Sequence, residues 1–146
     1  MTRFVRREQL AALTATHFKE ITRDGNLYNA GYVYLKKGDL ADAKAKAEEC
    51  RKNADAADRI FQKRLACELA GMIALEEKEY DRALQELTQA NQQDPYTLYR
   101  MALAARGKGD RESARDLCMK AADFNALNSL SYAFVRSKAR EMVKTL

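Results

Sequence analysis

The sequence predicts an all-α protein in which about three helix–turn–helix repeats stack into a solenoid, with flanking N-terminal and C-terminal helices. Apolar and small residues recur every three or four positions in the stretch Leu69–Pro95, the spacing of one face of an α-helix. Similar stretches precede and follow it, at Leu27–Cys50 and Leu98–Ala122. One proline and six glycines in 146 residues leave little room for a β-rich chain.

The middle stretch contains two helical patterns separated by the short polar segment EEKEYD, residues 76–81. A connection of this length only allows a tight reversal, so the two helices are expected to run antiparallel. One helix pair of this size cannot bury its own apolar stripe. The neighbouring copies are therefore expected to pack beside it.

Small residues occur at corresponding places in the three copies. When the copies are aligned on their turns, each has a small residue in its first helix and an alanine twelve residues later: Gly31 and Ala43, Gly71 and Ala83, Ala102 and Ala114. Small side chains let two helix backbones approach closely. We therefore expect these positions to lie at helix crossings.

At these positions the chain resembles the tetratricopeptide repeat family, a helix–turn–helix unit of about 34 residues. The middle copy fits best, through Cys67, Ala70, Gly71, Ala74, Ala83, Leu87, Ala90 and Pro95. No copy has the tryptophan of the family pattern. The repeat spacing is uneven, with 40 residues from Ala43 to Ala83 and 31 from Ala83 to Ala114. The resemblance, which covers about 24–128, implies an irregular superhelix.

The whole chain is interpreted as one domain. Its parts are an N-terminal helix or half-repeat (1–23), repeat 1 (24–54), repeat 2 (55–95), repeat 3 (96–128) and a C-terminal capping helix (129–146). To absorb the extra length before repeat 2, Asp55 is expected to cap a helix of about 23 residues that reaches about Lys78. Ser129 or Ser131 is expected to cap a last helix that reaches about Thr145.

The net charge of +5 is concentrated at the two ends of the sequence. Solubilised end helices explain this distribution better than a nucleic-acid surface, which should be basic along a groove or one helix face. Contact with an anionic membrane or a nucleic acid is the minor alternative. No apolar run is long enough for membrane insertion. The N-terminus lacks a secretory pattern and the three cysteines fall on apolar helix positions, so a cytoplasmic protein is expected unless the chain is part of an exported one.

The sequence contains no arrangement typical of catalysis. The single histidine, His17, falls on or beside an apolar helix face, where it is expected to be packed. Segment 107–110, GKGD, lacks the strand and the earlier glycine of a phosphate-binding loop. No serine, threonine or cysteine has a base near it in a nucleophile pattern. We expect no enzyme activity, cofactor or metal.

The resemblance implies that an extended peptide or a helix of a partner protein binds in a concave groove lined by the first helix of each repeat. Carried over residue by residue, the groove positions are Tyr28, Tyr32, Lys36, Glu68, Met72, Tyr96, Tyr99, Leu103 and Arg106, with Leu35, Leu65, Leu75 and Glu76 beside them. Tyrosine offers rigid apolar area with a hydroxyl, and methionine adapts its shape. Packing of these side chains between repeats is the alternative interpretation.

The carboxylate-binding mode of chaperone-type repeats is not expected, because Tyr28, Tyr32 and Leu69 stand where that mode needs lysine and asparagine. A mostly apolar ligand is therefore the main hypothesis. Two alternatives remain: a structural spacer that self-assembles into a homo-oligomer, and a small secretion-type chaperone that cradles an apolar segment of its client.

Overall fold

The protein is an all-α solenoid of stacked helical hairpins. The computed structural model describes residues 19, 22–23, 25–56, 58–124 and 130–146. The first helix of the stack is described over 25–37. After it come α2 (Leu40–Ala56), α3 (Ile60–Glu76), α4 (Tyr80–Gln89), α5 (Pro95–Gly107), α6 (Arg111–Ala122) and α7 (Leu130–Thr145), and no strand occurs among the described residues. The predicted fold class is confirmed.

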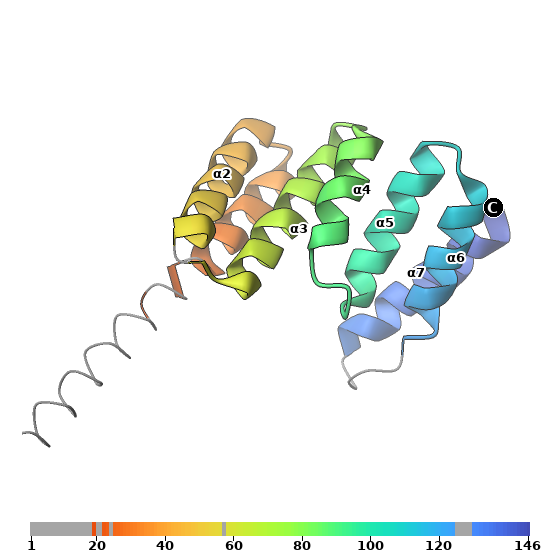
Figure 1. Ribbon diagram of the computed structural model, residues 1–146. Helices are drawn as coiled ribbons and strands as arrows, with labels where there is room; N and C mark the ends of the chain where they lie inside the picture. The colour runs from red at the N-terminus through yellow and green to blue at the C-terminus, as the bar shows by residue number, and fades with distance from the viewer. Residues whose placement is uncertain (1–18, 20–21, 24, 57, 125–129) are drawn as a thin grey trace, which may run out of the picture.

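Three hairpins form the body of the stack: 25–37 with α2, α3 with α4, and α5 with α6. Figure 1 shows them side by side in chain order, with α7 behind α6 at the end of the row. Each labelled helix packs on the next, and α3 also contacts α5 while α5 contacts α7. Helix 25–37, α3, α5 and α7 therefore form one layer, which we call the inner layer.

The turns inside the hairpins share one backbone conformation. Gly38, Lys78 and Gly109 occupy the same turn position and all have a positive φ, of 82°, 60° and 84°. Glycine adopts this left-handed conformation at little cost, whereas a residue with a Cβ is strained there. Asp110 then begins α6 by accepting a hydrogen bond from the Ser113 amide, and Asp94 begins α5 in the same way through the Tyr96 amide.

The prediction of one long helix from Asp55 to about Lys78 was wrong. Asp55 lies in the last turn of α2, and the chain reverses through Asp58 before α3 begins at Ile60. Asp58 has a φ of +47°, a conformation that aspartate tolerates better than most residues. The extra length is instead shared by α2 and α3, which have 17 residues each, against 10 in α4 and 12 in α6.

The small residues shared by the repeats lie at helix contacts, as predicted. A Cβ added to Gly31 would lie 2.5 Å from Leu69 Cδ2, and one added to Gly71 would lie 2.6 Å from Leu87 Cγ. Both leucines are completely buried. Each glycine therefore holds open the space that a core leucine fills. The corresponding alanines are also fully buried: Ala43, Ala83, Ala102 and Ala114.

Helix α7 covers the end of the third hairpin. Its buried residues Val135, Ala139 and Met142 face inward, and the last two join a core cluster with Ala102 and Cys118. Its end at Thr145 agrees with the prediction. Ser131 lies inside the helix rather than before it, and the other candidate cap, Ser129, falls outside the described residues.

Three further predictions concern the N-terminal helix, membrane-spanning helices and the cysteines. Most of the predicted N-terminal helix, His17 included, lies outside the described residues. Among the residues that are described, no helix is both long and apolar enough to cross a bilayer. No disulfide joins the three cysteines, and Cys50 and Cys118 are buried.

Candidate partner-binding groove

The inner layer carries a cavity of about 440 Å³, which we call the groove. It is lined by Tyr32, Leu35, Lys36, Met72, Leu75, Glu76, Tyr80, Tyr96, Tyr99, Arg100, Leu103 and Lys138. Leu35 and Met72 are only 6% exposed, so they form its floor. The four tyrosines are half-buried, and their rings form much of the remaining wall.

Helical spacing repeated in three helices builds this lining. Residues at positions i, i+3 and i+4 lie on one face of a helix. Helix 25–37 contributes Tyr32, Leu35 and Lys36; α3 contributes Met72, Leu75 and Glu76; α5 contributes Tyr96, Tyr99 and Arg100. Each helix thus presents two apolar or aromatic side chains followed by one charged side chain. The stacking of the hairpins places the three sets along one cavity.

A buried carboxylate beside the groove connects three inner helices. Glu68 of α3 is 7% exposed and accepts a hydrogen bond from the Tyr28 hydroxyl at 2.9 Å. The same oxygen accepts a second bond from Arg100 Nη1 of α5 at 2.5 Å. A buried charge is stable only when it is paired and hydrogen-bonded, and Arg100 supplies the opposite charge here.

Tyr28 is the neutral member of this cluster. Burial, followed by the negative charge of Glu68, raises the pKa of the Tyr28 hydroxyl well above its ordinary value of 10.0. The phenol therefore keeps its proton and remains a hydrogen-bond donor throughout the physiological range.

The charged side chains of the groove differ in their pairing. Arg100 is neutralised by Glu68 and also lies over the Tyr96 ring, 5.7 Å from its centroid. Lys36 lies over the Tyr32 ring at 5.4 Å. Within the described part of the chain, Lys36, Glu76 and Lys138 are exposed and have no ion-pair partner.

Six of the nine predicted site residues line the groove together: Tyr32, Lys36, Met72, Tyr96, Tyr99 and Leu103. Leu35, Leu75 and Glu76 line it too. Tyr28 and Glu68 form the buried cluster beside it, while Arg106 and Leu65 lie outside the lining.

The sequence reasoning missed three lining residues. Arg100 could have been found, because it follows Tyr96 by four residues as Lys36 follows Tyr32. Tyr80 belongs to the segment 76–81 that is predicted as a turn, but it is the first residue of α4. Its ring packs closely on Gly107, where an added Cβ would lie 2.3 Å from Tyr80 Cε1. Lys138 gives no local signal, because its place depends on how α7 docks against α5.

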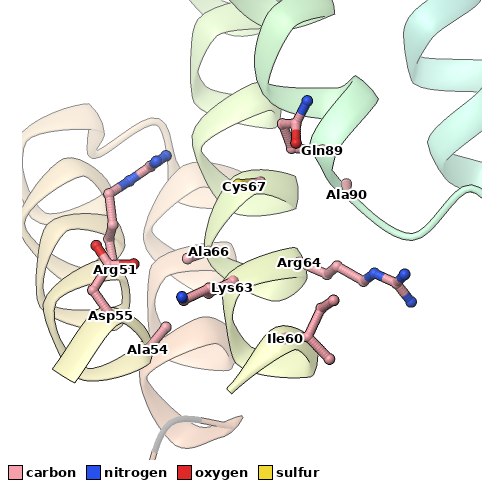
Figure 2. A pocket seen from close by; sticks show the side chains of 10 residues that line it. All are labelled: Arg51, Ala54, Asp55, Ile60, Lys63, Arg64, Ala66, Cys67, Gln89 and Ala90. Atoms are coloured by element: carbon pink, nitrogen blue, oxygen red, sulfur yellow. The ribbon is translucent and has the colours of Figure 1, made fainter. Parts of the chain in front are cut away.

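A second cavity, of about 390 Å³, lies among α2, α3 and α4 (Figure 2). Two of its cations already have carboxylate partners, because Arg51 pairs with Glu86 at 2.7 Å and Lys63 with Asp58 at 2.6 Å. Figure 2 shows Arg64 pointing to the other side of α3 from Lys63. This cavity therefore does not bring its cations together on one ligand, and the groove is the better candidate site. Among the described residues, no cluster of three or more metal-ligating side chains occurs.

Comparison with known protein families finds a match in the first of the hairpins that form the groove. The family model described as tetratricopeptide repeat matches residues 25–50, the hairpin formed by 25–37 and most of α2. The chain carries a tetratricopeptide repeat. No curated protein and no solved structure shows a significant match. The two hairpins after this tetratricopeptide repeat have small residues at the corresponding places, Gly71 and Ala83 in one and Ala102 and Ala114 in the other, and the same turn conformation. They extend it into a tetratricopeptide-like solenoid.

Proposed function

We propose that this tetratricopeptide-repeat protein binds a peptide or helical segment of a partner protein in the groove. Solenoid repeats form extended surfaces suited to such ligands. The observation that carries the proposal is the aromatic lining, in which Tyr32, Tyr96 and Tyr99 come from two hairpins and remain partly exposed. A cavity lined by rigid aromatic rings around a buried floor of Leu35 and Met72 is suited to holding apolar side chains.

The test uses peptides selected from a displayed random library on the wild-type protein. The variant is Tyr32→Ala combined with Tyr96→Ala. The matched control is Tyr34→Ala, because Tyr34 is on the same helix and packs against the same core cluster but does not line the groove. The double variant should lose binding by tenfold or more, as expected for aromatic anchors at a binding site. The control should bind as the wild type does.

The proposal fails if the selected peptides bind the double variant as tightly as the wild type. Thermal unfolding of all three proteins accompanies the binding measurement, so that loss of fold is distinguished from loss of the binding surface. A chaperone that cradles an apolar client segment would use the same groove and would pass the same test.

A self-assembling spacer is the second candidate function. Two adjacent side chains at the start of α3 favour it, because Ile60 is 69% exposed and Phe61 is 60% exposed. Light scattering over a range of concentrations tests it. A dimer that Ile60→Ser combined with Phe61→Ser converts to a monomer would support this function, and a wild-type monomer at high concentration would exclude it.

A further inference from the structure

The strongest unassigned feature of the molecule is the pair of lysines in the groove. Lys36 belongs to the first hairpin and Lys138 to α7, so they come from the two ends of the inner layer (Figure 1). Both are exposed, and neither has a carboxylate partner within the described part of the chain. The other cation of the groove, Arg100, is already paired with Glu68.

We propose that the occupant of the groove is a segment with an apolar centre and carboxylate side chains on both sides of it. This inference rests on the proposed function and adds the chemistry of the partner. The centre would contact the tyrosines, Leu35 and Met72, and the flanking carboxylates would approach Lys36 at one end and Lys138 at the other.

Charge pairing is the physical reason. A partner that fills the groove removes water from the lysine ammonium groups, and a desolvated charge is costly unless an opposite charge replaces the water. Carboxylates provide that charge, and complementary rim charges favour both the encounter and the correct partner. Glu76 is the one acidic residue among the described groove lining; it lies on α3, between the two end helices, and forms no ion pair with Lys36 or Lys138 among the described residues.

Two other occupants fit less well. The chain's own first eight residues contain three arginines and one glutamate, so they would be repelled by both lysines. A single-stranded nucleic acid could stack on tyrosines, but it needs a continuous basic track for its phosphates. Here Glu68 neutralises Arg100, and Glu76 places a negative charge within the groove.

The test uses an array of synthetic peptides in which each of many apolar centres is made with glutamate, glutamine or lysine flanks. Three proteins are compared: the wild type, K36E combined with K138E, and K37E combined with R140E. The last is the matched control, because Lys37 and Arg140 are exposed neighbours on the same two helices and lie outside the groove, and the change in net charge is the same. An oligouridine strand serves as the nucleic-acid probe.

The wild type should bind glutamate-flanked peptides roughly tenfold more tightly than their glutamine-flanked counterparts, and added salt should weaken this preference. The preference should disappear in K36E/K138E and remain in K37E/R140E. Equal binding of all three flanks by the wild type would overturn the inference while leaving the proposed function standing. Tighter binding of oligouridine than of any peptide would overturn it as well, and absence of all peptide binding would overturn both.

Discussion

The hydroxyl of Tyr28 donates a hydrogen bond to Glu68 across the junction between the first and second hairpins, and Glu68 in turn pairs with Arg100 of the third. One carboxylate thus connects helix 25–37, α3 and α5 beside the groove. Because these helices belong to three successive hairpins, their relative positions depend partly on a single side chain.

Replacing Glu68 with alanine should reduce the free energy of unfolding by about 3 kcal/mol, because Arg100 would be left in a largely buried place without its counter-charge. Urea denaturation measures the loss. Tyr28→Phe removes only one hydrogen bond to a charged group, and should cost about 1.5 kcal/mol. In the double variant E68A/R100A the loss should be smaller than the sum of the two single losses. Additive losses would show that the two charges do not stabilise each other.

The raised pKa of Tyr28 predicts a loss of stability in alkaline solution. Below pH 10 the phenol is protonated in both the folded and the unfolded chain, so it contributes no pH dependence. Above pH 10 the unfolded chain releases this proton while the folded chain retains it, so the free energy of unfolding falls as pH rises. Urea denaturation at a series of pH values measures the fall. Tyr28→Phe should show a shallower fall than the wild type; identical profiles would contradict the prediction.

Gly71→Ala should reduce the free energy of unfolding by about 2 kcal/mol, because the new methyl group would overlap Leu87 at the crossing of α3 and α4. Gly25→Ala is the control, since a Cβ there meets nothing within 4 Å and its backbone is helical. The control should gain up to about 1 kcal/mol from the better helix propensity of alanine. Thermal and urea unfolding distinguish the two, and equal stabilities would contradict the proposed close packing.

Thr97→Val should stabilise the protein by about 1 kcal/mol. The Thr97 side chain is fully buried, and its hydroxyl oxygen has no hydrogen-bond partner among the described residues. Valine has the same shape and removes the cost of burying that hydroxyl. Thr97→Ser keeps the hydroxyl and removes a methyl group, so it should destabilise by about 1 kcal/mol. A loss of stability in the valine variant, measured by urea unfolding, would reveal a partner for the hydroxyl.

Lys78→Gly should also stabilise, by about 1 kcal/mol, because Lys78 holds the left-handed turn conformation that Gly38 and Gly109 adopt in the other two hairpins. The same substitution at Lys37, which lies in a helix, should cost about 1 kcal/mol. A melting temperature that falls in both variants would contradict the assignment of strain to this turn.

Local spacing was sufficient to predict the hairpins, and the resemblance to tetratricopeptide repeats predicted much of the groove lining. The three-and-four spacing that places Tyr32 beside Lys36, and Met72 one turn from Glu76, is a property of a single helix. The glycine contacts followed from the repeat alignment, since Gly31 and Gly71 stand where neighbouring helices cross.

Features that depend on contacts between distant helices could not be predicted from the spacing of residues within one helix. The sequence predicted a helix start at Asp55, whereas the chain reverses three residues later, at Asp58, whose positive φ is not indicated by any helical spacing. The position of Lys138 in the groove results from the docking of α7 on α5 and α6. No spacing within α7 encodes that contact.

The double role of α7 has a consequence for engineered arrays. The same helix closes the stack through Val135 and Met142 and supplies a groove wall through Lys138. Inserting one more hairpin between α6 and α7 would therefore move Lys138 farther from Lys36. The number of hairpins would then determine the length of the peptide that can reach both lysines.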